Sequence, residues 1–220
     1  MKVNYKQLQQ RILHPVLIGL VTAGAIACIS EVNSALTKSA IAKEVVSLEK
    51  SAPKPVPPDQ VGYRSRLGFS FGYSLNSFVV EEKIASRTNN VNSPLGTVDI
   101  WTKKHAQKIR AGEYAGGTEY PANVHVSVYR NNRKLPLQKW VKQSNEFSAT
   151  REFKTAKIAG QTGIKFKSSG LYENEHVVFT SPKDSRILVV TLSKTGYGDN
   201  DANYQKAYQQ LVDSFKFLNK

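Results

Sequence analysis

Apolar and polar residues alternate along several stretches after about residue 61, which is the pattern of half-buried β-strands. Residues 69–75 alternate aromatic or leucine side chains with Ser and Gly, and residues 124–128 alternate Val with His and Ser. Val79-Val80 is expected to continue the first strand after a bend. Further strands are expected at 98–101, 155–158, 163–167, 177–179 and 187–192. The last of these is a continuous apolar run, which predicts a central strand covered on both faces.

Two segments have the helical period instead. Pro136 suits the first turn of a helix, and Leu137, Trp140 and Val141 then form one apolar stripe. A longer C-terminal helix is expected from apolar residues on one side, namely Tyr204, Tyr208, Leu211, Val212 and Phe215, with Asp199, Asn200 or Asp201 as its cap. Successive strands with segregated helices predict an α+β domain, in which helices flank a mostly antiparallel sheet of about seven strands.

The first residues have the pattern of an export signal. A basic segment that contains Lys2, Lys6 and Arg11 precedes the uncharged run 16–27, which is too short to span a bilayer as a helix. The run ends in Ala25-Ile26-Ala27-Cys28, which resembles the bacterial lipobox, and Cys28 is the only cysteine. We expect a lipoprotein signal over residues 1–27 and lipidation of Cys28. Ordinary secretion with cleavage elsewhere and an uncleaved signal anchor are the alternatives.

A tether is expected to join this signal to one globular domain. Residues 28–60 are mixed and polar and end in a proline-rich stretch at 51–58, where prolines favour an extended, semi-rigid spacer. The domain is then expected to occupy residues 61–220, outside the cytoplasm, on the periplasmic side of a membrane.

Charge is the unusual feature of the composition, with 31 basic and 17 acidic residues. The signal contains three of the basic residues and no acid, so the remaining chain carries a formal charge of +11. The basic residues gather in two clusters, namely Lys103, Lys104, Lys108 and Arg110 after the second strand, and Arg130, Arg133 and Lys134 after the third. If these strands pair as a hairpin, we expect both clusters near one end of the sheet. Such a face would attract an acidic membrane protein or an anionic membrane surface. Nucleic acid is not an expected partner of an exported chain.

Motifs for catalysis or cofactor binding are weak. Gly68-Phe69-Ser70-Phe71-Gly72 matches G-x-S-x-G, but the alternation continues through it, whereas a hydrolase serine lies on a turn between a strand and a helix. We interpret Ser70 as a strand residue. His105, His125 and His176 lack metal-ligand spacing, so no metal ligand is assigned, although the fold could still assemble a site. No cofactor is expected.

The order of elements resembles the extrinsic P-subunit family of photosystem II (PsbP-like). The resemblance covers about residues 68–217 and rests on the aromatic strand 68–73, the short helix around 137–140, the strand-turn-strand segment 157–166 and the ending Asp213 to Phe217. It implies an α-β-α sandwich and a non-enzymatic accessory or assembly role at a photosynthetic membrane, on its thylakoid-lumen side. The loop 112–121 and the strong positive charge depart from the family pattern.

These observations leave three functions open. The leading hypothesis is an accessory or assembly lipoprotein that docks a basic face onto an acidic membrane-protein partner. The second is a periplasmic or cell-surface module that binds anionic lipid or polymer, with no photosynthetic role. The third is a serine hydrolase that uses Ser70.

Overall fold

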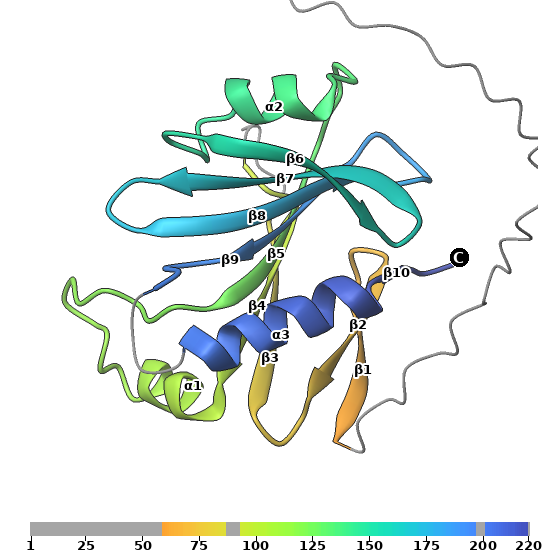
Figure 1. Ribbon diagram of the computed structural model, residues 1–220. Coiled ribbons are helices and arrows are strands. Elements are labelled where there is room, and N and C mark those ends of the chain that lie inside the picture. The colour runs from red at the N-terminus through yellow and green to blue at the C-terminus, as the bar shows by residue number, and fades with distance from the viewer. Residues whose placement is uncertain (1–58, 87–92, 197–200, 220) are drawn as a thin grey trace, which may run out of the picture. The chain divides into compact units, whose positions relative to one another are not determined.

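The structure is a computed structural model that describes residues 59–86, 93–196 and 201–219 (Figure 1). The expected signal, most of the tether and Cys28 lie outside these ranges, as do the expected helix caps Asp199 and Asn200. Within these ranges, no helix has the length and apolar character needed to cross a membrane.

Seven strands of the described chain form one antiparallel sheet in the order β3-β4-β5-β9-β8-β7-β6. The strands are β3 (Phe78–Ile84), β4 (Gly96–Thr102), β5 (Val124–Tyr129), β6 (Arg151–Ile158), β7 (Gln161–Ser169), β8 (Glu173–Thr180) and β9 (Ile187–Leu192). All residues of β9 are buried and β9 lies in the middle of the order, which confirms the expectation for the apolar run.

A second sheet of three strands, in the order β1-β2-β10, packs beside the first. It consists of β1 (Gln60–Arg64), β2 (Phe69–Ser74) and β10 (Lys216–Phe217). Val79-Val80 was expected to continue β2, and this is wrong. The chain turns at residues 75–77, and β3 then pairs with β4 in the larger sheet.

Three helices connect or follow these strands in the described residues, namely α1 (Lys103–Arg110), α2 (Leu137–Gln143) and α3 (Asp201–Ser214). Pro136 is the N-cap of α2, in agreement with its predicted place at the start of that helix. α1 was not predicted, because only Ala106 of its residues is buried and the segment therefore lacks an apolar stripe. It begins at Thr102, whose side-chain oxygen accepts a hydrogen bond from the His105 N–H at 3.2 Å.

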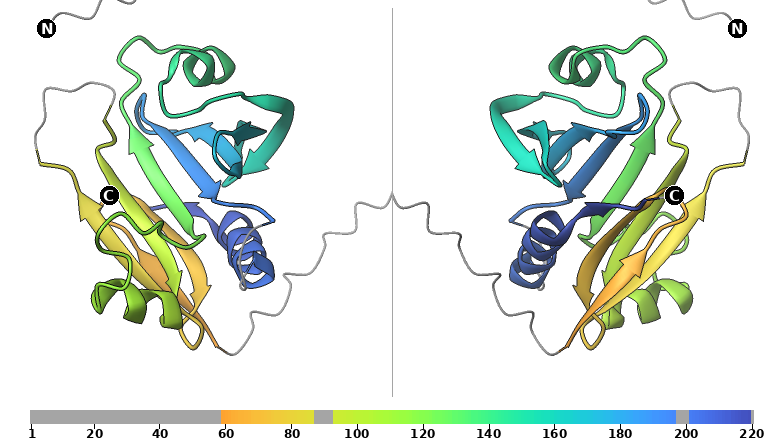
Figure 2. Two further views of the ribbon diagram at one scale, coloured as in Figure 1. Left: turned by 90° about the vertical axis from the view of Figure 1, so that its left-hand side faces the viewer. Right: turned by 90° about the vertical axis from the view of Figure 1, so that its right-hand side faces the viewer.

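The two faces of the large sheet are covered by different elements. Side chains alternate between the faces along each strand, so Val190 packs in the same core as Leu211 of α3, whereas Val189 packs with Val141 of α2. Figure 2 shows α2 and α3 on opposite sides of the curved sheet. β2 contributes Phe69 to the α3 side of the core. The fold is thus α+β, with helices on both faces of an antiparallel sheet.

Candidate docking site

The structure places the two predicted clusters of basic residues at opposite ends of the sheet. Antiparallel pairing sets Ile100 opposite Val124 and Gly96 opposite Val128. α1 begins directly after β4 ends, and Arg130 follows the end of β5; the ends of two antiparallel neighbours point in opposite directions. The expectation that both clusters lie near one end of the sheet is therefore wrong. We call the first set, Lys103, Lys104, Lys108 and Arg110, the α1 cluster, and the second set, Arg130, Arg133 and Lys134, the corner cluster.

The α1 cluster is partly neutralised by neighbouring acids. The Lys108 ammonium lies 2.8 Å from a carboxylate oxygen of Glu113, and the Arg110 guanidinium lies 2.9 Å from one of Glu81. Lys103 and Lys104 are exposed on the first turn of the helix. Exposed charge of this kind is well screened by salt and gives little specificity.

The corner cluster adjoins a cavity of about 320 Å³ between the end of β5 and α2. Its lining residues include two arginines, two aromatic residues and several amides, namely Tyr129, Arg130, Asn131, Asn132, Arg133, Trp140 and Gln143. No acidic residue is found among the described residues that line it. Predicted basic residues and a concave surface thus coincide at this corner of the described structure.

The side chain of Asn131 fixes the loop that carries the two arginines. Asn131 is buried, and its Nδ2 donates to the Leu135 carbonyl at 3.0 Å while its Oδ1 accepts from the Leu135 N–H at 2.9 Å. The Lys134 N–H donates to the Asn131 carbonyl at 2.8 Å, and Lys134 takes a left-handed backbone conformation with φ +48°. The guanidinium groups thus project from a loop ordered before any partner binds, which lowers the entropy cost of binding.

Aromatic side chains form the wall behind the arginines. The ring centroids of Tyr129 and Trp140 are 5.2 Å apart, and Phe147 meets Trp140 edge-on at 6.1 Å. Burial, with the nearby Glu146 carboxylate adding to it, raises the pKa of Tyr129 well above its ordinary value, so the phenol stays neutral at physiological pH. Trp, Tyr and Arg are the residues most enriched among binding hot spots.

The corner cluster keeps most of its charge available to a partner. Arg133 donates to the Gln143 side-chain oxygen at 3.3 Å, while Arg130 and Lys134 have no hydrogen bond or ion pair from their side chains within the described chain. Lys139 and Lys142 of α2 are exposed but do not line the cavity, and the Lys142 ammonium lies 5.8 Å from the centroid of the Phe153 ring. Guanidinium groups bind carboxylates through paired, charge-assisted hydrogen bonds, so this arrangement suits an acidic side chain or chain terminus.

Sequence reasoning missed several residues of this site. Trp140 was recognised only as part of an apolar stripe, and Asn131 was not among the expected site residues. Their position beside Arg130 depends on how the loop between β5 and α2 folds back on itself. The Asn131-Asn132 pair ahead of Pro136 is the local sequence feature that indicates this turn.

The residues considered for catalysis and for metal binding do not have the arrangement that either function requires. Ser70 lies inside β2, between partners Arg64 and Lys216 on the neighbouring strands, and not on a turn into a helix. This confirms its interpretation as a strand residue. His176 is buried, and its ring nitrogens bond Ser168 at 2.8 Å and Thr191 at 2.9 Å. Neither nitrogen is free for a metal in this arrangement, and the described residues contain no cluster of three or more metal-binding side chains.

Comparisons with known proteins show similarity at the level of fold only. No protein-family model matches the chain, and no curated protein matches it. The solution structure of cyanobacterial PsbP (CyanoP) from Synechocystis sp. PCC 6803 is 11% identical, covers 76% of this chain and 97% of its own, and has a TM-score of 0.42. A crystal structure from Bacteroides thetaiotaomicron VPI-5482 is 8% identical, covers 74% of this chain and 50% of its own, and has a TM-score of 0.39. At these TM-scores, neither likeness carries an argument about function.

Proposed function

We propose that this protein is a non-enzymatic, extracytoplasmic accessory or assembly factor that docks an acidic membrane-protein partner. The docking site is the cavity beside the corner cluster, where Arg130 and Arg133 flank an aromatic wall. The N-terminal segment exports the chain, and a lipid on Cys28 holds it at the membrane surface. A tether ahead of residue 61 then gives the domain reach to its partner.

The observation that supports this function best is the coincidence of cationic charge, aromatic surface and concave shape at one corner. The α1 cluster is also cationic, but two of its four residues, Lys108 and Arg110, form ion pairs with acids of the same chain. At the corner, Arg130 and Lys134 carry charge that no described residue neutralises. An acidic segment that enters the cavity would satisfy both arginines and cover Trp140.

A pull-down from detergent-solubilised membranes tests this proposal. Replacing Arg130 and Arg133 together by Ala is expected to reduce partner recovery about tenfold or more, because each charge-assisted hydrogen bond contributes about 1.5–3 kcal/mol. The matched control replaces Lys103 and Lys104 by Ala, which removes the same formal charge from the α1 cluster. Equal recovery with the two double variants would contradict a specific role of the corner.

Salt dependence and lipid flotation separate the protein partner from the second candidate. Recovery of an acidic partner is expected to fall at high salt, since exposed charges are screened over about 8–10 Å at physiological ionic strength. Binding of the untethered domain to anionic vesicles, with no protein recovered, would favour a lipid- or polymer-binding module instead. Because the sequence motifs resemble the P-subunit family, subunits of photosystem II are the first partners to seek.

Lipidation can be tested directly by mass spectrometry of the native N-terminus. A mature chain that begins with diacylglyceryl-modified Cys28 is the expected result. A chain that begins at another residue, or one that retains residues 1–27, would contradict the lipoprotein proposal. The first outcome would leave a secreted domain, and the second a signal anchor.

A further inference from the structure

Exposed apolar side chains gather at one end of the molecule. The large apolar side chains that are exposed in the described chain are Val61, Leu75, Ile84, Tyr120 and Leu171. The antiparallel registers place all of them except Ile84 at or near the end of the sheet where β4 runs into α1. Single exposed apolar residues are common on soluble proteins, but their gathering at one end indicates a surface that is covered.

We call this end of the molecule the α1 end, and it consists of α1, the loop 111–123 and the turns 75–77 and 170–172. Contacts between these segments make its surface continuous. The Lys103 N–H donates to the Ser77 carbonyl at 3.0 Å, which joins α1 to the β2–β3 turn. The Tyr172 hydroxyl donates to the Glu119 carboxylate, which joins the β7–β8 turn to the loop between α1 and β5.

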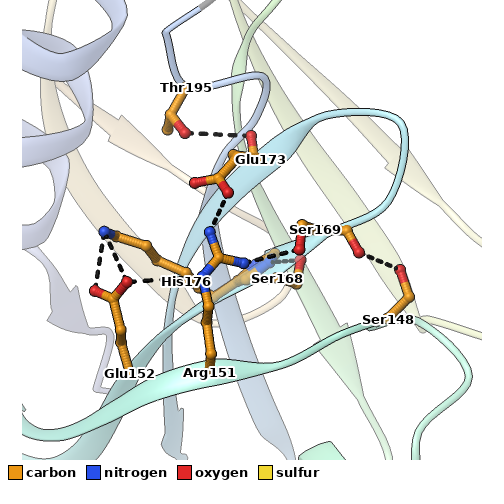
Figure 3. Close-up of polar contacts among 9 residues, drawn as sticks. Ser148, Arg151, Glu152, Ser168, Ser169, Glu173, His176 and Thr195 are labelled. Atoms are coloured by element: carbon orange, nitrogen blue, oxygen red, sulfur yellow. Dashed lines mark hydrogen bonds and ion pairs between the residues drawn. The ribbon is translucent and has the colours of Figure 1, made fainter.

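Leu171 stands on a turn whose base is firmly bonded to its neighbours. Arg151 bonds Ser169 at the end of β7 and Glu173 at the start of β8, as Figure 3 shows. The Thr195 hydroxyl donates to the Glu173 carbonyl at 3.3 Å from the other side. Leu171 itself is 77% exposed, so this ordered turn presents an apolar side chain that gains free energy when it leaves water.

The α1 end also has cations that the acids of the described chain leave unpaired. Lys103 and Lys104 are exposed and form no ion pair within the described residues. Glu113 and Glu119, the two acids of the loop between α1 and β5, are already paired with lysines at 2.8 and 3.2 Å. Asp59 beside β1 sets one negative charge against the two free lysines. The surface therefore keeps a positive charge.

The chain ahead of β1 joins the domain at this same end. Gln60 begins β1 and pairs with Ser74, the last residue of β2, directly before the β2–β3 turn. Under the proposed function, a lipid on Cys28 anchors the preceding segment in a membrane. The anchor is thus connected to the end of the domain that has the exposed apolar and basic side chains.

We propose that the α1 end lies directly on an anionic lipid bilayer, a contact that rests on the proposed membrane location and adds to the docking function. Tyr120 and Leu171 would enter the headgroup region, where an amphipathic tyrosine ring and a leucine are both favoured. Lys103 and Lys104 would lie against lipid phosphates, to which each exposed cation adds attraction. Separate apolar tips with lysines between them suit a fluid surface, which adjusts to them, better than a rigid protein face.

This orientation has a consequence for the docking cavity. The corner cluster lies at the opposite end of the sheet, and β4, which runs between the two ends, has seven residues. At the rise of a β-strand this places the cavity about 20 Å or more from the bilayer surface. The acidic segment of the partner must then project at least that far from the membrane.

An environment-sensitive label on the mature chain tests which end contacts lipid. Cys28 is the only cysteine, so Cys28→Ser removes both the lipid and the native thiol, and one new cysteine can be labelled with NBD. The label is placed through Leu171→Cys or, as the matched control, through Ile84→Cys at the opposite end. With vesicles of equimolar phosphatidylglycerol and phosphatidylcholine, emission from residue 171 should shift to the blue and be quenched by doxyl-labelled lipid. Emission from residue 84 should not change.

Vesicle flotation of the unlabelled Cys28→Ser chain measures the contribution of charge. Lys103→Ala together with Lys104→Ala should lower the partition coefficient about tenfold, because each cation near an anionic surface contributes attraction. Lys139→Ala together with Lys142→Ala is the control, since it removes the same formal charge from α2, away from the α1 end (Figure 1). It should lower the coefficient less than about twofold, and vesicles of phosphatidylcholine alone should bind the chain at least about tenfold more weakly.

Several results would overturn the inference. An unchanged spectrum at residue 171, or equal shifts at residues 171 and 84, would exclude the proposed orientation. Equal partition of the two double-lysine variants, or equal binding to neutral and anionic vesicles, would exclude the proposed charge contact. A blue shift at residue 171 with solubilised membrane proteins but not with vesicles would show a protein partner at this end. The pull-down with the Arg130 and Arg133 variants is done in detergent without a bilayer, so the docking proposal and this inference can fail separately.

Discussion

His176 is a buried histidine kept neutral by its surroundings. Its imidazole packs against two phenylalanines, with ring centroids 4.8 Å from Phe166 and 4.9 Å from Phe147. Burial, with His125 adding to it, lowers the pKa of His176 to about 3. Burial also lowers the pKa of His125, although the nearby Asp99 carboxylate acts in the opposite direction. Folding therefore excludes the protonated form of both side chains.

This arrangement predicts acid-sensitive stability. The unfolded His176 has a pKa near 6.5, so between about pH 6.5 and 3 the unfolded chain binds a proton that the folded chain does not. The free energy of unfolding should therefore decrease as pH falls through this window, by up to about 1.4 kcal/mol per pH unit from this group. Urea denaturation at pH 7 and pH 5 measures the change. His176→Gln, which does not titrate, should show a smaller difference, and an unchanged difference would contradict this assignment.

Asn131 is a second residue on which local structure depends. Asn131→Ala removes both hydrogen bonds to Leu135 and leaves its half-buried N–H and C=O groups without these partners, so it should lower the free energy of unfolding by about 1–3 kcal/mol. The exposed neighbour provides a control, since Asn132→Ala should change stability by less than about 0.5 kcal/mol. Equal effects of the two variants in urea denaturation would show that the side chain of Asn131 does not hold the loop.

Among the elements, α3 depends most clearly on one apolar side. Leu211 is 1% exposed in the core that α3 shares with β2, β5 and β9. Leu211→Ala should therefore lower the free energy of unfolding by about 2–5 kcal/mol, through lost burial and the cavity left behind. Lys206→Ala, on the exposed side of the same helix, should have little effect. A small loss for Leu211→Ala, measured in urea, would mean that α3 is not part of the cooperative core.

Elements with a strong local pattern could be predicted from sequence, and elements held by distant partners could not. The alternation at 124–128 and the apolar run at 187–192 correspond to β5 and β9, because burial on one or both faces leaves a direct pattern. β1 and β10 were missed, since both are specified by pairing with β2. α1 has a cap at Thr102 but only one buried residue, so its sequence reads as a polar segment.

At the scale of the whole molecule, the distribution of charge was the hardest feature to predict. The sequence identifies the basic residues, but their arrangement in space depends on strand direction. Both clusters were expected near one end of the sheet if these strands paired. β4 and β5 do pair, but because they are antiparallel, the α1 cluster after β4 and the corner cluster after β5 lie at opposite ends. The cavity beside Arg130 forms where the chain folds back on itself between β5 and α2, so it has no local signal in the sequence.

Because the two basic clusters lie at opposite ends of the sheet, a crosslinking probe beside each one can show which cluster the partner contacts. A photoreactive amino acid at Asn132 would stand at the rim of the docking cavity, and one at Lys104 would stand on α1 at the opposite end of the sheet. Both side chains are exposed, so neither substitution should disturb the core.

Photocrosslinking in native membranes, followed by mass spectrometry of the products, is the most direct measurement. The account predicts that the probe at Asn132 crosslinks to an acidic segment of a membrane protein, and that the probe at Lys104 gives little or none of that product. Crosslinks to the same protein from Lys104 alone, or only lipid adducts from Asn132, would contradict the proposed docking site.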